Sequence, residues 1–184
     1  DRSLVWTSQR LVEQFLGSAY RFTEMKGKPP ISKNSLTRID LLVDRDDTED
    51  VKEAIRLGKA VATGVTAHKN ISNLPGNICT PTLMADAAKD LAKYYKSVTT
   101  KVLNEADMTK LGMGAFMAVS QGSEQPGKMI IMQHQGSSKA DRPFVIVGKG
   151  ITFDTGGISL KSNAGMADMI FDMCGAACVL GTMT

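Results

Sequence analysis

The sequence predicts an α/β protein with a mostly parallel or mixed sheet flanked by helices. Segments with helical and strand patterns alternate through most of the chain, as in sheets whose strands are joined by helices. Residues 144–147 (FVIV) form a short apolar run, the pattern of a strand that is buried on both faces. An alanine-rich segment suited to a helix follows Asp172.

Length and composition are those of an ordinary globular protein. The chain has 184 residues, enough for one or two domains, and 22% of them are charged. We expect no membrane partner, because no apolar run looks long enough to cross a bilayer and the first residues lack the apolar core of a signal peptide. Three cysteines without framework spacing favour a reducing compartment, so the expected location is cytoplasmic.

Two helices and a strand are expected in the first 72 residues. Residues 4–22 carry apolar side chains at helical spacing, and a surface loop rich in Gly and Pro follows them. Residues 36–43 have the pattern of a strand. Residues 47–72 give the longest helical pattern, with an acidic first turn that suits the positive end of the helix dipole.

The middle of the chain continues the alternation of helix and strand. Thr80 is suited to cap a helix that starts at Pro81 and runs to about Tyr95. The next expected elements are a strand at 98–103, a short helix at 105–111 and a strand at 129–135. Ligands of such sheets bind beyond the carboxyl ends of the strands. We therefore expect a site directly after the apolar run at 144–147.

Four charged residues interrupt the apolar, glycine-containing sequence at this place: Lys149, Asp154, Lys161 and Asp172. Charged side chains are kept out of such segments unless they are paired or bind a metal. Carboxylates suit zinc, manganese or magnesium, and a lysine amine can bind a metal once desolvation and a nearby cation favour its neutral form. A surface lysine, a helix cap or a turn aspartate is the alternative for each position.

Several motifs together resemble the leucyl aminopeptidase (cytosol aminopeptidase) family. They are VGKGITFDTGGISLK at 147–161, DMCGAA at 172–177, NLPGNICTPT at 73–82 and LGMGAFMAVSQGSEQP at 111–126. The resemblance implies a two-metal aminopeptidase that removes leucine-like, apolar N-terminal residues from peptides by means of metal-activated water. It also implies the tail of a smaller α/β N-terminal domain at 1–46, a linker helix at 47–72 and the N-terminal part of the catalytic domain at 73–184.

The resemblance assigns roles to five residues. Lys149, Asp154 and Asp172 correspond to ligands of two divalent metal ions, Zn²⁺ and/or Mn²⁺ or else Mg²⁺, and Asp154 would bridge the two. Lys161 corresponds to the catalytic lysine, whose fixed charge would stabilise the peptide carbonyl oxygen as it becomes negative. Met169 corresponds to a wall of the pocket for the first substrate side chain, although a core methionine has the same pattern.

One motif of the family is absent from this sequence. NTDAEGR, which supplies two more carboxylate ligands and an arginine, does not occur in it. We therefore expect a fragment that lacks the C-terminal part of the catalytic domain, and a chain that ends at Thr184 would be catalytically silent. The resemblance also implies a cytoplasmic homohexamer.

DNA binding is the alternative function from another class. Its candidate basic patch consists of Lys26, Lys28, Lys33 and Arg38. Basic residues scattered over a loop are usually a solvated face, and the net charge of +3 does not by itself indicate nucleic acid. Binding to DNA through phosphates would weaken steeply as the salt concentration rises.

Overall fold

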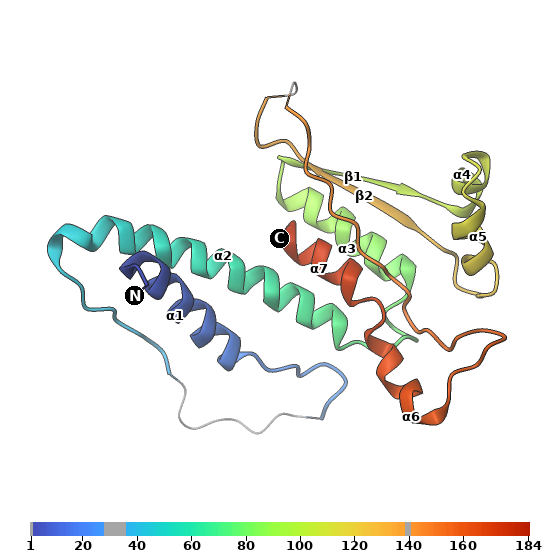
Figure 1. Cartoon of the computed structure of the whole chain (residues 1–184), viewed down its shortest axis with the longest axis horizontal. Coiled ribbons are helices and arrows are strands. Elements are labelled where there is room, and N and C mark those ends of the chain that lie inside the picture. Colours follow the sequence, from blue (N-terminus) through green and yellow to red (C-terminus); the bar gives the residue numbers. More distant parts are fainter. Residues whose placement is uncertain (1, 28–35, 139–140) are drawn as a thin grey trace. The chain divides into compact units, whose positions relative to one another are not determined.

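The computed structural model describes residues 2–27, 36–138 and 141–184 (Figure 1). The chain forms two compact units, Asp1–Thr66 and Ala67–Thr184. The boundary between them falls inside the long helix α2, Thr48–Ser72, which confirms the long helix predicted at 47–72.

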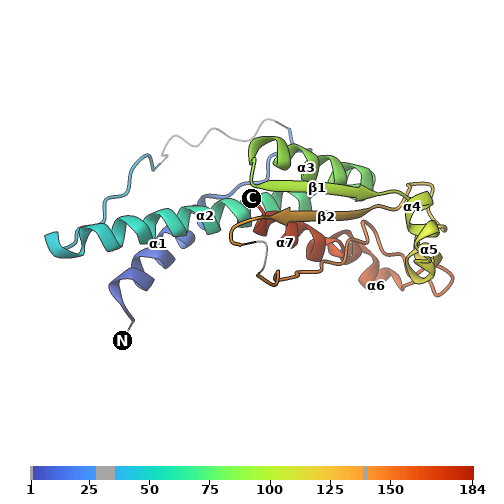
Figure 2. The same ribbon diagram turned by 90° about the horizontal axis from the view of Figure 1, so that it is seen from above.

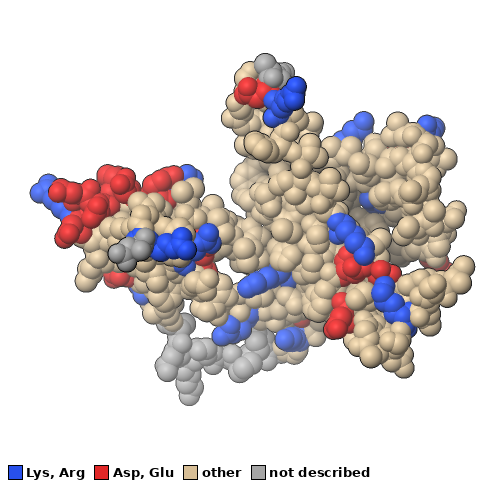
Figure 3. Space-filling view, viewed as in Figure 1, with Lys and Arg blue, Asp and Glu red and all other residues tan. Residues whose placement is uncertain are grey.

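The described part of the first unit contains two helical segments besides most of α2. Helix α1, Leu4–Ala19, is capped by the Ser3 hydroxyl, which accepts a hydrogen bond from the backbone N–H of Trp6 at 3.2 Å. The 3₁₀ helix η1, Arg45–Asp47, leads into α2. Asp and Glu side chains gather at this N-terminal end of α2, where Figure 3 shows a red patch. An acidic first turn suits the positive end of the helix dipole.

The strand predicted at 36–43 does not form. These residues have no regular secondary structure, and Leu42 is 96% exposed. A strand is stabilised by backbone hydrogen bonds to a neighbour, and the sequence pattern alone cannot supply that neighbour. The predicted tail of an α/β domain is therefore not confirmed.

The first complete helix of the second unit is α3, whose start was predicted residue by residue. Helix α3, Pro81–Tyr94, has Thr80 at its N-cap, and the Thr80 hydroxyl accepts a hydrogen bond from the N–H of Leu83 at 3.2 Å. The Thr100 hydroxyl on the neighbouring strand donates to the carbonyl of Ala88 at 2.9 Å. This hydrogen bond ties the middle of the helix to the strand.

The sheet of this unit has two strands. Strands β1, Val98–Leu103, and β2, Met129–His134, pair antiparallel from Val98↔His134 to Leu103↔Met129. Figure 2 shows the two strands side by side, with α3 next to β1. The connection between the strands contains α4, Glu105–Lys110, as predicted, and α5, Gly114–Ser120, which was not predicted.

The predicted parallel or mixed sheet is not confirmed. Among residues 2–27, 36–138 and 141–184, the only sheet is the antiparallel β1–β2 pair. The apolar run at 144–147 forms no strand, and Phe144 and Val147 are 101% and 90% exposed. Its composition suits a buried strand, but no other described strand pairs with it.

The last part of the chain is a series of short helices. They are α6, Asn163–Met166, the 3₁₀ helix η2, Ala167–Phe171, and α7, Cys174–Thr182. Helix α7 confirms the predicted alanine-rich helix. By length and composition alone, the run Asn163–Thr182 could cross a membrane, contrary to the prediction from the sequence. This is weak evidence for a membrane span, because the run is broken into three helical pieces and contains Asp168 and Asp172.

Candidate metal centre

The four charged residues singled out in the sequence lie together in the second unit. Lys149 Nζ is 2.6 Å from Asp172 Oδ2 and 3.7 Å from Asp154 Oδ2. Lys161 Nζ is 2.8 Å from Asp154 Oδ2. We refer to these four side chains as the charged cluster. Figure 3 shows blue and red side chains meeting over the loops next to α6 and α7.

Lys149 is positioned by a close crossing of two backbones. A Cβ atom on Gly148 would lie 2.3 Å from the carbonyl oxygen of Gly175, near the start of α7, so no larger residue fits this contact. Next to it, the carbonyl of Lys149 accepts a hydrogen bond from the N–H of Ala176 at 2.8 Å. The first turn of α7 therefore holds the backbone of Lys149. This helix begins at Cys174, two residues after Asp172.

Asp154 and Lys161 are joined by the loop between them. The N–H of Gly156 donates to Asp154 Oδ1 at 2.9 Å, and the N–H of Lys161 donates to the carbonyl of Thr155, also at 2.9 Å. Lys161 Nζ donates in addition to the backbone carbonyl of Asp154 at 3.1 Å. The loop thus folds back on itself and brings the ammonium of Lys161 onto the carboxylate of Asp154.

The charged cluster favours its ionised state. The hydrogen bond from Lys161, followed by that from the Gly156 N–H, holds the pKa of the Asp154 carboxyl well below its usual range. The hydrogen bond with Asp172, together with the charges of Asp172 and Asp154, raises the pKa of Lys149. Both carboxylates are mostly covered, with 29% of the Asp154 side chain and 22% of the Asp172 side chain exposed.

Comparison with known proteins decides the family. A model described as "Cytosol aminopeptidase family, catalytic domain" matches residues 66–184, more than half of the chain. The chain belongs to the cytosol aminopeptidase family. The matched residues coincide with the second compact unit and include the whole charged cluster.

Relatives of known sequence support the same assignment. The chain is 48% identical over 183 residues to a probable cytosol aminopeptidase of Thioalkalivibrio sulfidiphilus, covering 99% of this chain and 37% of that protein. It is 46% identical over 184 residues to a probable cytosol aminopeptidase of Nitrosococcus oceani, covering 100% and 37%. The chain therefore spans little more than a third of the length of these relatives.

Solved structures also resemble this member of the cytosol aminopeptidase family. A structure described as "Bottromycin maturation enzyme BotP in complex with Mn" is 26% identical, with a TM-score of 0.75. The match covers 96% of this chain and 35% of BotP. A second structure of BotP is 28% identical, with a TM-score of 0.70, over 96% of this chain and 34% of BotP.

The oxygen and nitrogen atoms of the charged cluster are of the chemical types that bind divalent metal ions. The ammonium of Lys149 lies within reach of both carboxylates, at a place where a cation is favoured. Two carboxylates and an amine are donors that zinc and manganese accept. Within the described part of the chain, no point gathers three or more His, Cys, Asp or Glu side chains. Three donors from Lys149, Asp154 and Asp172 cannot alone complete the coordination of two ions.

Met169 and the candidate DNA patch were also singled out in the sequence, but neither belongs to the charged cluster. Met169 is half-buried in η2, and its carbonyl accepts the N–H of Asp172 at 3.3 Å. In the candidate DNA patch, Lys26 is exposed and Arg38 pairs with Asp40 at 2.8 Å. The patch residues Lys28 and Lys33 lie outside the described residues.

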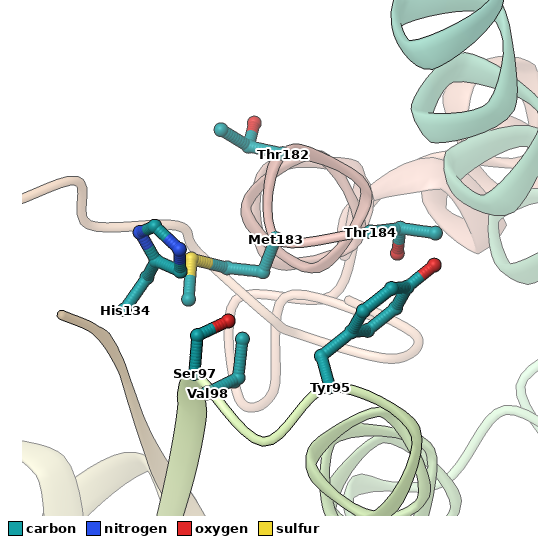
Figure 4. A pocket seen from close by; sticks show the side chains of 7 residues that line it. All are labelled: Tyr95, Ser97, Val98, His134, Thr182, Met183 and Thr184. Carbon is teal, nitrogen blue, oxygen red and sulfur yellow. The ribbon is translucent and has the colours of Figure 1, made fainter. Parts of the chain in front are cut away.

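A pocket of about 300 Å³ lies elsewhere in the second unit (Figure 4). Its walls come from the end of α3, the paired ends of β1 and β2, and the end of α7. The lining residues are Tyr95, Ser97, Val98, His134, Thr182, Met183 and Thr184. No motif in the sequence marked this pocket, and no residue of the charged cluster lines it. We place the chemistry at the charged cluster, because a functional site is recognised by its reactive groups and this pocket lacks paired charges.

A buried thiol near the cluster was also missed from the sequence. Cys79 is fully buried, and burial, with a smaller contribution from neighbouring Cys174, raises the pKa of its thiol to about 11. A thiol with so high a pKa is a packing group and no nucleophile at neutral pH. Its electrostatic interaction with Cys174 nevertheless places the loop before α3 near the start of α7, two residues after Asp172.

Proposed function

We propose that the chain carries part of the centre of a two-metal aminopeptidase, which removes leucine-like, apolar N-terminal residues from peptides. The observation that carries the proposal is the convergence of two carboxylates and two lysines in the charged cluster. Membership of the cytosol aminopeptidase family and the manganese in the BotP complex support it. Because the chain spans 37% of its relatives, the activity is proposed for the whole protein.

Lys149, Asp154 and Asp172 are the proposed ligands for the two ions, with Asp154 as the bridge. Asp154 suits this role because its carboxylate is held by fixed donors and has a lowered pKa, so it is ionised at neutral pH. Lys149 must release a proton in order to bind a metal, since only the neutral amine has a lone pair. A divalent cation that replaced this proton would satisfy the same two carboxylates.

Lys161 is the proposed catalytic residue. Its ammonium is held by both the carboxylate and the backbone carbonyl of Asp154, and its side chain is 32% exposed, so it is fixed but accessible. A cation in this position stabilises the negative charge that develops on the peptide carbonyl oxygen during hydrolysis. When bound, the metal ions supply an activated water and polarise the same carbonyl.

Met169 is the proposed wall of the pocket for the first substrate side chain. It lies in η2, three residues before Asp172, and the hydrogen bond between their backbones ties the two together. A flexible thioether suits apolar side chains of different shape.

We also propose the domain organisation, location and oligomeric state of the whole protein. We assign residues 1–46 to an N-terminal domain, 47–72 to a linker helix and 73–184 to the catalytic domain. The family match, which begins at residue 66, supports the catalytic part. The names of the relatives support a cytoplasmic location, and a homohexamer is proposed from the family resemblance.

Metal binding by this chain tests the proposed function. We expect the metal-free chain to bind Mn²⁺ or Zn²⁺ and Asp154→Ala to lose all bound metal, because one carboxylate serves both ions. The measurement is metal content after gel filtration, by atomic emission. Retention of the bound metal by Asp154→Ala would contradict the assignment of Asp154 as a ligand, and retention of two ions by the same variant of the whole protein would contradict the assignment of the bridge.

A further inference from the structure

A loop outside the charged cluster is in direct backbone contact with the segment that carries Asp154. This support loop, residues 73–80, connects α2 to α3. A Cβ atom on Gly76 would lie 2.9 Å from the Cβ of Phe153 and 3.2 Å from the carbonyl oxygen of Thr152. Separations below about 3.0 Å do not occur between real Cβ atoms and their neighbours, so only glycine permits this approach.

The support loop is itself firmly held. The carbonyl of Pro75 accepts hydrogen bonds from the N–H groups of both Ile78 and Cys79, each at 2.9 Å. Cys79 is fully buried near Cys174, and the cap at Thr80 fixes the end of the loop to α3. The loop can therefore resist a displacement of the segment that touches it.

The contact acts on the residue adjacent to Asp154. Phe153 precedes Asp154 directly, and on the other side the Asp154 carboxylate accepts hydrogen bonds from the N–H of Gly156 and from Lys161. The backbone of Asp154 is thus fixed between the support loop and its own loop. We infer that Gly76 is a positioning residue for the metal centre, setting the place of the Asp154 carboxylate through Thr152 and Phe153.

The expected effect of Gly76 on metal affinity rests on the proposed function, because Asp154 is a proposed metal ligand. Groups that orient a metal ligand without touching the metal typically change its affinity by about 10- to 100-fold when they are removed. Gly76→Ala should act in this way. The added methyl group meets a Cβ and a backbone carbonyl rather than the flexible end of a side chain, so the backbone at 152–153 has to move.

The test compares Gly76→Ala with a matched control in the full chain. Gly58→Ala adds the same methyl group against the carbonyl oxygen of Gln9 at 2.7 Å, in the first unit. Mn²⁺ affinity is measured by isothermal titration calorimetry, and the amide resonance of Gly156 is recorded by NMR without metal. We expect Gly76→Ala to weaken Mn²⁺ binding about tenfold or more and to shift the Gly156 amide, and Gly58→Ala to do neither.

Three other outcomes decide whether Gly76 positions the Asp154 carboxylate. Unchanged Mn²⁺ affinity and an unchanged Gly156 resonance in Gly76→Ala would overturn the positioning role, as would an equal loss of affinity in Gly58→Ala. If the unaltered chain binds no Mn²⁺, its three donors do not hold a metal ion without the rest of the centre, and the metal-free Gly156 resonance alone decides the positioning role. If Gly76→Ala does not fold, Phe153→Gly tests the same contact, because it removes the Cβ that faces Gly76. Unchanged Mn²⁺ affinity and an unchanged Gly156 resonance in that variant would overturn the inference.

Discussion

At the scale of single residues, Lys149 has to serve two different charge states. Its ammonium makes the shortest ion pair of the charged cluster, at 2.6 Å from Asp172, and this contact raises its pKa. As a proposed metal ligand the same nitrogen must be neutral. In the proposed role the two states would compete for the same carboxylates, so we expect protons and metal ions to displace one another at this position.

Lys149→Arg separates the metal-ligand role from that of a surface cation. Arginine keeps the positive charge and can still pair with Asp172, but it does not deprotonate in a protein and so offers no lone pair. We expect the variant to fold and to lose the metal ion that Lys149 holds, with metal content as the measurement. In the unaltered protein, metal occupancy should fall with pH while the carboxylates, whose ordinary pKa is about 4, are still ionised. Normal metal content and activity in the arginine variant would exclude Lys149 as a ligand.

Lys161→Ala tests the proposed catalytic role. Loss of one group that stabilises developing charge typically lowers turnover about a hundredfold or more, and Lys161 is not a proposed ligand, so metal content should change little. Hydrolysis of leucine amide by the Mn²⁺-loaded whole protein gives the turnover, and metal analysis of the same sample gives the content. Near-normal turnover would reduce Lys161 to a counter-ion of Asp154.

At the scale of elements, helices were predicted well because their signals are local. The start of α3 follows from Thr80 and Pro81, and both the cap hydrogen bond and the first helical residue are where the sequence places them. Helix α5, Gly114–Ser120, was missed because it starts at a glycine and has neither a capping side chain nor charges in its first turn. The strands at 36–43 and 144–147 were predicted wrongly because pairing is a long-range property that their composition does not determine.

The cap of α3 allows a quantitative prediction. Thr80→Ala removes the hydroxyl that accepts the N–H of Leu83, so the free energy of unfolding should fall by about 1 kcal/mol. Thr80→Ser keeps a hydroxyl and should retain most of that stability. Urea unfolding followed by circular dichroism measures both variants. Equal losses in the two would show that the methyl group of Thr80, and not its hydroxyl, matters.

At the scale of the whole molecule, the structure brings together the charged residues singled out in the sequence but does not form the predicted parallel or mixed sheet. The four positions of the charged cluster were identified from residue types and family resemblance, and the structure brings them within ion-pair distance. The supporting contacts could not be read from the sequence, because Gly76 and Phe153 are 77 positions apart and neither carries a reactive group. Their relation is a matter of backbone approach, which only the folded chain defines.

The charged cluster should also contribute to the pH dependence of the stability of the metal-free chain. Because the folded-state pKa of Asp154 is lowered from 3.8, its contribution is complete above that value and is lost as pH falls toward the folded-state pKa. The raised pKa of Lys149 acts in the opposite range: its contribution is complete below 10.5 and is lost as pH rises above it. The acid side of the stability curve therefore reports on Asp154 together with Glu53 and Glu105, whose pKa values are also lowered by hydrogen bonds.

Asp154→Asn should flatten the acid side of the curve. The amide cannot form the ion pairs with Lys161 and Lys149, so the variant should melt at a lower temperature near neutral pH. Between about pH 5 and pH 2.5 its melting temperature should fall less than that of the unaltered chain, because it has no lowered carboxyl pKa to lose. Circular dichroism in the presence of a chelator measures both curves, and Asp168→Asn, which removes an exposed carboxylate of η2, serves as the control. If Asp154→Asn kept the full acid slope while Asp168→Asn reduced it, the acid sensitivity would arise from carboxylates outside the charged cluster.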